Sequence, residues 1–541
     1  MIRIALLCCG LVAAGIAQAP PAVVKKVIRG GGAQNTRVME HLDQLVNGIG
    51  PRLTSSDNLT KACEWAREKF KSFGIKNARL EEWGTFPVGF NRGPWTGRMI
   101  KPEKLALEFG TPSWSPGTKG PQRGPVRIAP GDAAELRRNA DQFKGAWVIA
   151  PRTMTGGLSG RRIRRQDREK LFREVGVLGV LRGTRALIIT SGNKNIDWDG
   201  LPKIPTINLT GDHFKKIKSL AEDGRDVELE FDIHNNFKKG PIKLYNVIAE
   251  IKGSDKPDEL VIVGGHIDSW DGATGTTDNG TGVATTLEAA RLLMKAGARP
   301  KRTIRFMLWS GEEQGLLGSR AYIRQHPEEN DRISAVLVHD GGTNYVSGIA
   351  ATDAMYEPMQ RVLKPLFDLD ETMKFSVRKV RSLPYPIGSD HDSYIAVGVP
   401  GFFWNQKGRA VYRRTHHTQH DTFKAAIPEY QVHTAKVVAI ASLAIANLPD
   451  KLNRTGMRRA NRFSRRRIFG VRYDDKMVVT RVTEGSVAEK AGIKIKDKIL
   501  RVGKTKVKDR FTLAEALKDG KVKKIVVRRG NREVTLTARF D

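Results

Sequence analysis

The stretch Val263-Gly264-Gly265-His266-Ile267-Asp268 decides the fold, because an apolar run ends there in two residues that carry chemistry. Further apolar runs of strand length, bounded by turns, follow at 303–309, 334–340 and 399–404. Helical patterns at 282–296 and 316–325 lie between some of these runs. This alternation predicts an α/β domain with a mixed, largely parallel sheet flanked by helices, whose functional residues follow the carboxyl ends of strands.

His266 and Asp268 are two residues apart, so in an extended segment their side chains lie on the same face. The Asp268 carboxylate can then hydrogen-bond one ring nitrogen of His266 and leave the other nitrogen for a metal ion. His-x-Asp also occurs by chance, and alone it fits a structural hydrogen bond better. The remaining strand ends therefore decide how it is interpreted.

Four more polar segments follow predicted strands or open helices of the same domain. They hold Asp278 before Asn279, the pair Glu312-Glu313, Asp340, and His417 within 416–422. The glycine-rich stretch 271–280 matches neither Gly-x-Gly-x-x-Gly nor a phosphate loop, which argues against a nucleotide site. Adjacent side chains at a strand end point in different directions, so one carboxylate of the Glu pair can hold a metal while the other faces a water.

Acids gathered at one sheet edge would repel one another strongly, and this domain brings together Asp268, Asp278, Glu312, Glu313 and Asp340. Two divalent cations would nearly balance these charges. A mixture of imidazole and carboxylate suits zinc, whereas an all-oxygen set would suit magnesium or calcium. The sequence therefore predicts a zinc site with more than one ion.

The order of motifs, His-x-Asp, Asp-Asn-Gly, Glu-Glu, Asp-Gly-Gly and His-x-x-x-Asp-Thr, resembles that of the di-zinc exopeptidases of clan MH over residues 35–450 with one insertion. The resemblance implies two zinc ions per chain, a bridging Asp278 and four terminal ligands, which are His266, Glu313, Asp340 and His417. It gives Glu312 the role of general base. Asn279 matches the position that follows the bridging acid through a non-proline cis peptide.

Two further positions are interpreted through the same resemblance. His391, within 388–391, matches a pocket loop whose histidine contacts the tetrahedral intermediate. His416 stands where relatives often have tyrosine, so help to the oxyanion from this position is left open.

The chain is expected to contain several units. The catalytic domain is expected at 35–95 and 241–450, interrupted at 96–240 by a β-rich insertion that resembles a protease-associated domain. Residues 451–467 hold eight basic residues and no acid, which indicates a solvated linker. The tail 468–541 resembles a PDZ domain, with Ile468-Phe469-Gly470-Val471 as its carboxylate-binding loop. It is expected to capture a peptide C-terminus by strand addition, or else to be an appendage without a ligand.

Residues 1–19 are typical of a secretory signal peptide, because Arg3 precedes an apolar run that is too short to span a membrane and small residues follow it. Cleavage after Ala17 is favoured over cleavage after Ala19, since Pro20 would come next. The alternative is an uncleaved anchor. We expect a secreted or periplasmic protein whose remaining cysteine, Cys63, is a small buried residue without a disulfide.

Composition sets the broad class of the protein. A length of 541 residues suffices for three or four domains, and 40% hydrophobic with 28% charged residues excludes a disordered or fibrous chain. The net charge of +34 predicts attraction to anions. Basic residues gather in 152–185 and 451–467 without a recognition motif, so nonspecific contact with an anionic envelope, or plain solvation, is expected instead of specific nucleic-acid binding.

The predicted function is that of an exported zinc exopeptidase acting on peptides, with an aminopeptidase placed slightly ahead of a carboxypeptidase or dipeptidase. A carboxypeptidase needs a cation for the free carboxylate of its substrate, which Arg409, Arg413 or Arg414 could supply. A catalytically silent scaffold that binds peptides is the alternative from another class.

Overall fold

A computed structural model describes residues 20–156, 161–185, 187–188, 191–192, 197–457, 469–474, 477–483, 486–507, 512–513, 516–517 and 522–540. The predicted signal peptide, most of the predicted linker and Ile468 lie outside the described residues. The chain divides into two compact units, Met1–Met457 and Arg458–Asp541. Among the described residues no helix is long and apolar enough to cross a membrane.

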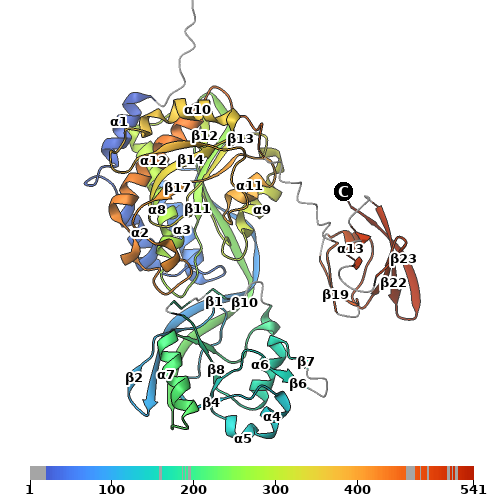
Figure 1. The fold of residues 1–541 in the computed structure, drawn as a ribbon. Helices are drawn as coiled ribbons and strands as arrows, with labels where there is room; N and C mark the ends of the chain where they lie inside the picture. Colours follow the sequence, from blue (N-terminus) through green and yellow to red (C-terminus); the bar gives the residue numbers. More distant parts are fainter. Residues whose placement is uncertain are drawn as a thin grey trace, which may run out of the picture. The chain divides into compact units, whose positions relative to one another are not determined.

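A mixed sheet forms the centre of the first unit (Figure 1). From one edge its strands are β16 (Gly401–Phe403), β13 (Ile333–Val338), β11 (Lys256–His266), β12 (Arg302–Trp309) and β10 (Glu228–Ile251), with β1 (Arg79–Lys101) paired to β10. The strands β16, β13, β11 and β12 run parallel, whereas β10 is antiparallel to β12 and to β1. The predicted mixed, largely parallel sheet is confirmed.

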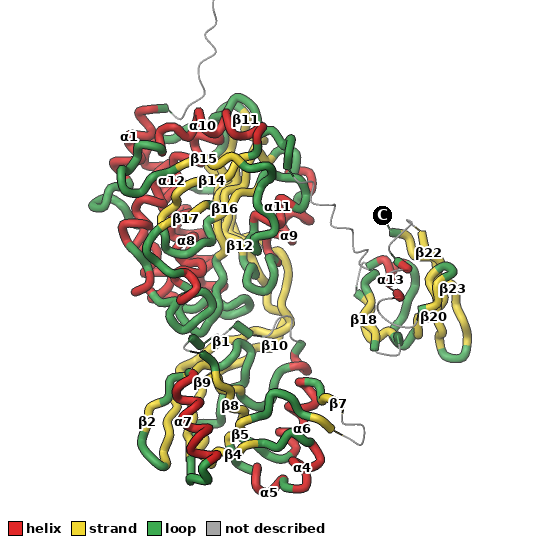
Figure 2. Tube along the Cα trace, viewed as in Figure 1, coloured by secondary structure: helices red, strands yellow, loops and turns green. Residues whose placement is uncertain are grey.

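Helices cover both faces of this sheet, as Figure 2 shows in red on either side of the yellow strands. One face packs against α3 (Asp57–Ser72), α8 (Thr281–Ala296) and α12 (Pro428–Ala446), and the other against α9 (Leu317–Gln325) and α11 (His391–Ile395). The helix α2 (Val38–Asp43) packs against α8 and α12. Along β11, Val261 and Val263 belong to the first core, whereas Leu260 and Ile262 belong to the second. The alternation of a strand therefore supplies both cores from one continuous apolar run.

Smaller elements complete the catalytic part of this unit. A separate three-stranded sheet has the order β15 (Ser376–Lys379), β14 (Tyr345–Ala351) and β17 (Asn405–Lys407). The remaining helices are α1 (Pro21–Gly30), the π-helical turns Gln44–Ile49 and Thr276–Gly280, α10 (Asp353–Leu363) and short 3-10 turns.

The insertion continues the catalytic sheet. Beyond β10 the strand order runs through β4 (Gln122–Ile128), β5 (Trp147–Ile149), β8 (Gly179–Gly183), β9 (Thr206–Leu209) and β3 (Phe109–Gly110), and β2 (Leu105–Ala106) pairs with β1. Its helices are α4 (Ala133–Arg138), α5 (Ala140–Phe143), α6 (Arg165–Glu174) and α7 (Gly211–Glu222), and a small hairpin joins β6 (Thr155–Gly156) to β7 (Arg161–Arg162).

The expected boundaries of the insertion at 95/96 and 240/241 fall inside single strands. Arg79 pairs with Ile248 at one end of the β1–β10 ladder, and Lys101 pairs with Glu228 at the other. The two strands therefore leave the catalytic sheet together and enter the insertion as one long antiparallel pair (Figure 1). Because they hydrogen-bond each other on the way, no loop linker separates the two parts.

The second unit is small and rich in strands. It contains the pair β18 (Val471–Tyr473) and β19 (Val479–Val482), a sheet of β21 (Thr505–Lys506), β20 (Lys498–Val502), β22 (Val522–Arg529) and β23 (Arg532–Arg539), and the helix α13 (Val487–Lys490). Phe469, Ile499 and Ile525 lie in its own core. Gly470 has a positive φ of 80°, and a Cβ there would lie 2.1 Å from the Cβ of Ser486, so only glycine fits this turn.

Candidate active site

The carboxyl ends of the parallel strands bring the predicted site residues to one edge of the sheet. His266 is the last residue of β11 and pairs with Trp309, the last residue of β12. Glu312 and Glu313 follow three and four residues after Trp309, and Asp340 follows the end of β13. This placement is the one the sequence predicts for a parallel α/β sheet.

Two clusters of ligand atoms share Asp278. On one side, His266 Nε2 lies 3.2 Å from Asp278 Oδ1 and 3.1 Å from Asp340 Oδ1. On the other side, His417 Nε2 lies 3.2 Å from Asp278 Oδ2 and 3.0 Å from Glu313 Oε2. Each cluster therefore contains one imidazole, one carboxylate that the other cluster lacks, and one oxygen of the shared Asp278 carboxylate. The structure thus brings together all five residues that the sequence singled out as ligands.

The backbone around Asp278 is held by a second carboxylate. Asp421 accepts hydrogen bonds from the N–H groups of Thr277 (2.6 Å) and Asp278 (3.2 Å). The peptide bond between Asp278 and Asn279 is cis, and the Asn279 side chain donates to the carbonyl of His339. Asp421 was noted in the sequence only for its spacing from His417, and its role in positioning Asp278 becomes visible in the structure.

The contact expected between the Asp268 carboxylate and the His266 ring is wrong in detail. His266 Nδ1 lies 2.9 Å from the main-chain oxygen of Asp268, and the Asp268 carboxylate is 3.6 Å away. That carboxylate instead accepts hydrogen bonds from Thr54 Oγ1 and from the N–H groups of Glu312 and Glu313. The reason is that Asp268 is fully buried beside the next strand end, where two backbone donors need an acceptor. Asp268 thus positions the Glu pair.

A fully buried arginine, Arg52, organises the loop between Asp268 and Asp278. Its guanidinium donates to the carbonyls of Gly50 and Ile267 and to those of Thr274 and Gly275, at 2.8–3.0 Å. Burial lowers the pKa of Arg52 to about 10, and the acids around it oppose this shift, so the group stays charged. This role could not be predicted, since one arginine after a Gly-Pro turn has no distinctive pattern.

Burial and mutual repulsion shape the titration of the site. Burial and the neighbouring Asp278 raise the pKa of Glu313 to about 7. Burial raises the pKa of Glu312 well above its usual range, and the negative charges of Asp340 and Glu313 add to this shift. Burial opposes the charged form of His417, but its contacts with Asp278 and Glu313 raise its pKa to about 10. The site holds more negative charge than its own histidines can balance.

The donor set fits zinc. Imidazole nitrogen with carboxylate oxygen is a combination that zinc accepts, and three protein ligands per ion would leave a position open for water or substrate. Glu313 Oε1 is buried without a hydrogen-bond partner among the described residues, which a cation would supply. His266, Asp278 and Glu313 offer ligand atoms that all lie within 4.8 Å of one another.

Aromatic rings stand beside the ligand clusters. The Trp270 ring meets the His417 ring edge to face at 5.8 Å, and both line a small pocket together with Asp278, Glu313 and Asp421. His416 is exposed, stacks on His417 at 3.8 Å, and its Nε2 lies 3.8 Å from Asp278 Oδ2. A substrate near the clusters would therefore meet Trp270 and His416. Trp270 was not singled out from the sequence.

His391, which the resemblance assigns to a pocket loop, is buried in the structure. Its side chain is 1% exposed, its ring packs against Phe403, and burial lowers its pKa to about 3. Neither ring nitrogen has a hydrogen-bond partner among the described residues. The preceding Asp390 is fully buried, and its pKa is raised to about 7 by burial. Asp390 is a further acid at this edge that the sequence did not reveal.

The insertion touches two of the loops that carry the site. Asp271, next to Trp270, accepts hydrogen bonds from Arg92 of β1 (3.0 Å) and from the hydroxyl of Ser113 (2.6 Å). Gln419, two residues after His417, accepts from the N–H of Ile188 and donates to the Glu108 side chain. Arg92 and Asp271 are almost fully buried. The insertion therefore supports both loops.

The arginines considered for a free carboxylate lie on the surface. Arg409 pairs with Glu429 at 2.6 Å, and the pair is exposed. Arg413 and Arg414 are exposed in the short turn before His417. Neither arrangement directs a guanidinium at the ligand clusters.

Comparison with known proteins identifies the family. The profile of Peptidase family M28 matches residues 246–442. Carboxypeptidase Q of Mus musculus is 30% identical over 436 residues, which cover 78% of this chain and 88% of that protein. The chain belongs to peptidase family M28. The expectation of a metallopeptidase is thereby confirmed.

Two other M28 relatives extend the comparison. A probable aminopeptidase of Saccharomyces cerevisiae is 29% identical over 241 residues, covering 41% of this chain and 61% of that protein. The crystal structure of a Peptidase M28 precursor from Shewanella amazonensis SB2B superposes with a TM-score of 0.57 at 24% identity, covering 80% of this chain and 97% of that one. This superposition shows that the chain has the same fold as the Shewanella protein.

Proposed function

We propose that this M28 peptidase is an exopeptidase that binds two zinc ions, one at His266, Asp278 and Asp340 and the other at Asp278, Glu313 and His417. The observation that carries this proposal is the pair of ligand clusters that share Asp278. Zinc bound there would supply Lewis-acid chemistry, polarising the scissile carbonyl and making a nearby water more acidic.

Glu312 is the general base of this proposal. Its backbone N–H donates to the Asp268 carboxylate, and its side chain is half-buried. In this role the Glu312 carboxylate would accept a proton from the attacking water and return it to the leaving nitrogen. Asp268 and Asp421 contribute by holding the backbones of the Glu pair and of Asp278.

Exchange of Glu312 for glutamine tests this role. Glu312→Gln should lower kcat by about a thousandfold or more while both zinc ions remain bound, as measured by elemental analysis. Glu357→Gln, an exposed change on α10, is the matched control and should keep full activity. Retained turnover in Glu312→Gln would refute the assignment, and loss of zinc would make Glu312 a ligand.

We propose that the site recognises the free amino end of its peptide substrate, so that the enzyme is an aminopeptidase. If all are ionised, the acids Asp268, Asp278, Glu312, Glu313, Asp340, Asp390 and Asp421, together with Arg52 and two zinc ions, leave the site a net charge of about −2. The residues that line its pocket include no lysine or arginine. An ammonium group complements such a site, whereas a substrate carboxylate would be repelled.

A carboxypeptidase or dipeptidase is the second candidate, because the similarity to carboxypeptidase Q extends over most of this chain. A panel of dipeptides blocked at the amino end or at the carboxyl end separates the two. An aminopeptidase cleaves the carboxyl-blocked set and leaves the amino-blocked set intact, and the opposite pattern would establish the carboxypeptidase.

For the second unit we propose a PDZ-like site that binds peptide C-termini. Its support is the glycine turn at Gly470, which follows the core residue Phe469 and leads into β18. Fluorescence anisotropy with matched peptides that end in a carboxylate or an amide tests it. Amidation should weaken binding at least tenfold, and equal binding would make the unit an appendage.

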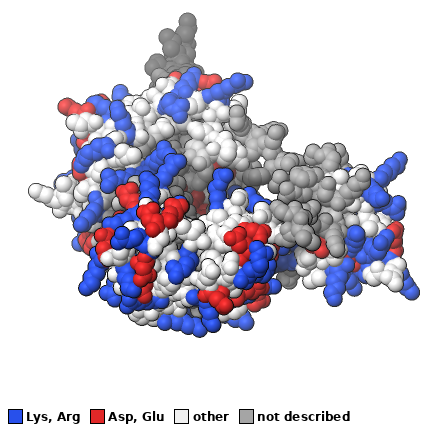
Figure 3. All heavy atoms as spheres, turned by 60° about the horizontal axis from the view of Figure 1, so that its bottom comes forward, with Lys and Arg blue, Asp and Glu red and all other residues white. Residues whose placement is uncertain are grey.

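We also propose that the enzyme is exported and that its basic surface gives nonspecific attraction only. On the face shown in Figure 3, lysines and arginines alternate with acidic residues and form no continuous stripe of one sign. Fractionation of cells that express the full chain tests the export. Binding to DNA and to anionic vesicles should vanish as salt is raised to physiological strength, and tight residual DNA binding would contradict this view.

A further inference from the structure

We propose that His416 is a reversible ligand of the zinc ion bound at Glu313 and His417, and that it occupies the open position of that ion until a substrate displaces it. The proposal rests on the two-zinc site and adds one residue to it. Its basis is a further group of donor atoms, because Asp278, His416 and His417 offer ligand atoms that all lie within 4.8 Å of one another. His416 Nε2 lies 3.8 Å from Asp278 Oδ2, the oxygen that His417 also approaches.

The backbone of this loop brings two consecutive imidazoles to the same side. Neighbouring side chains of an extended segment point to opposite faces, yet the rings of His416 and His417 stack with their centroids 3.8 Å apart and their planes inclined by 30°. His417 has a φ of 59°, in the left-handed region that residues other than glycine rarely adopt. Such conformations persist where the surrounding structure determines them, and they gather at functional sites. The turn at His417 therefore lets both rings approach Asp278.

Hydrogen bonds of the main chain and of threonine side chains fix the position of His416. The Thr277 hydroxyl donates to the Thr415 hydroxyl at 2.7 Å, so the residue before His416 is tied to the residue before Asp278. The N–H of His416 donates to the Tyr412 carbonyl at 2.9 Å, and the Tyr412 ring lies 5.0 Å from the His416 ring. These contacts hold the imidazole beside the shared carboxylate.

Exposure distinguishes this donor from the ligands that stay in place. The side chain of His416 is 48% exposed, whereas those of Asp278 and Glu313 are 6% and 3% exposed. An exposed imidazole can rotate into water without leaving a buried polar group unpaired. A neutral imidazole also adds no negative charge to a site that is already rich in acids. Because catalytic zinc keeps one position for water or substrate, His416 suits a position that is filled at rest and opens for substrate.

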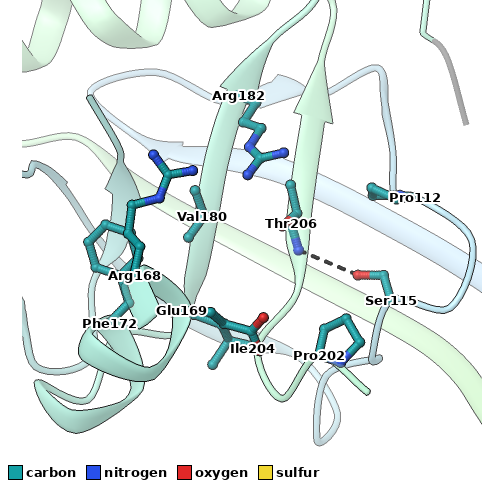
Figure 4. Close-up of a pocket in the computed structure, with 10 residues that line it drawn as sticks. All are labelled: Pro112, Ser115, Arg168, Glu169, Phe172, Val180, Arg182, Pro202, Ile204 and Thr206. Atoms are coloured by element: carbon teal, nitrogen blue, oxygen red, sulfur yellow. Dashed lines mark hydrogen bonds between the residues drawn. The ribbon is translucent and has the colours of Figure 1, made fainter. Parts of the chain in front are cut away.

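Zinc bound to the first unit is expected at the catalytic edge. The insertion pocket in Figure 4 is lined by no histidine or cysteine, and its single acid, Glu169, accepts a hydrogen bond from a backbone N–H. The surface group around His326 is already engaged, because Glu329 pairs with Arg305 at 2.7 Å and His326 with Glu81 at 2.9 Å. Zinc affinities measured on the full chain therefore report on the two ligand clusters.

Substitution by phenylalanine separates ligation from stacking. His416→Phe keeps an aromatic ring against His417 but has no nitrogen to offer to zinc. Competition with a chromophoric chelator, measured on the full chain, should show that one of the two zinc ions binds about tenfold or more weakly than in the wild type while the other is unchanged. His420→Gln, a partly exposed change in the same loop, is the matched control and should keep both affinities. Added imidazole should restore the lost affinity in His416→Gly by supplying the missing ring.

A small zinc ligand without a peptide bond, acetohydroxamate, measures whether His416 occupies the open position. The apparent affinity of a ligand falls with the fraction of protein that is free to bind it. At saturating zinc, calorimetry should therefore show that acetohydroxamate binds His416→Phe about threefold or more tightly than it binds the wild type. A variant with a disrupted site would bind both zinc and hydroxamate more weakly, so it cannot produce these opposite shifts.

Each outcome decides for or against His416 as a ligand. Weaker binding of one zinc ion together with tighter binding of acetohydroxamate in His416→Phe supports the proposal. Wild-type affinity for both zinc ions in His416→Phe would overturn it and leave the two-zinc site intact. Hydroxamate affinity that the substitution leaves unchanged would overturn the reversible occupancy. A wild type that binds fewer than two zinc ions would refute the two-zinc site as well, so the failures of the two proposals differ.

Discussion

Replacing Arg52 by methionine should destabilise the first unit and disorder the loop that leads to Asp278. The side chain is fully buried, and its guanidinium satisfies four backbone carbonyls at once. Methionine fills a similar volume but donates no hydrogen bond. The carbonyls of Gly50, Ile267 and Thr274 would lose their donor in a place that water reaches poorly, whereas that of Gly275 keeps the N–H of Gly280.

The expected size of the effect follows from this count. A buried carbonyl left without a partner costs at least ~1 kcal/mol, so three of them give about 3 kcal/mol in the free energy of unfolding. Arg52→Lys keeps the charge but presents a single ammonium group, which reaches fewer of the carbonyls, so about half of that loss is expected. Arg67→Met, a partly exposed change on α3, should alter the free energy of unfolding by less than about 0.5 kcal/mol.

Urea unfolding monitored by tryptophan fluorescence and by circular dichroism measures these differences. The two compact units should unfold separately, so the transition of residues after Arg458 serves as an internal reference. Zinc content and kcat of Arg52→Lys report on the loop itself. An Arg52→Met protein whose first unit unfolds at the same urea concentration as the wild type would refute the reasoning.

Further predictions concern the rest of the site. Asp268→Asn should lower kcat/KM or zinc affinity about 10–100-fold, because it weakens the anchor of the Glu312 and Glu313 backbones, and an unchanged enzyme would contradict that anchor. Arg92→Met should lower the free energy of unfolding by about 3–5 kcal/mol, because the buried Asp271 carboxylate loses its cation. Adding Asp271→Asn should restore part of this loss, and a double-mutant cycle in which the two changes are simply additive would argue against coupling. The raised pKa values of Glu313 and Asp390, both about 7, predict that zinc-free enzyme loses stability as the pH rises from about 4 to about 7, since over this range the unfolded state has released protons that the folded state still holds. Thermal melts of chelated enzyme across this range check the sign, and the stabilisation by added zinc should grow over the same interval.

The ligands could be predicted from the sequence because parallel strands place their ends at one edge. His266, the Glu312-Glu313 pair and Asp340 each follow an apolar run, so one topological rule brings them together. Local pattern thus determines both the strand and the position of the group that follows it.

The supporting contacts could not be predicted in the same way. Arg52 and Arg92 act through tertiary contacts that join segments far apart in the chain, and no periodicity records such pairings. The Asp268 carboxylate likewise accepts hydrogen bonds from the Glu312 and Glu313 N–H groups, which follow another strand, and this tertiary contact has no signature in the local sequence. His391 belongs to a motif, but the depth at which its ring is buried depends on how α11 packs against β16.

The long antiparallel pair of β1 and β10 has a consequence for how such an enzyme arises. Arg92 lies opposite Asn235, so a short turn at that level would close the hairpin before the insertion begins. Everything beyond it could be acquired or lost at the tip, leaving the register against β12 unchanged. An ancestor with a plain hairpin and a descendant with a whole added lobe would then share one catalytic sheet, and the lobe would have been oriented by two strands from its first appearance.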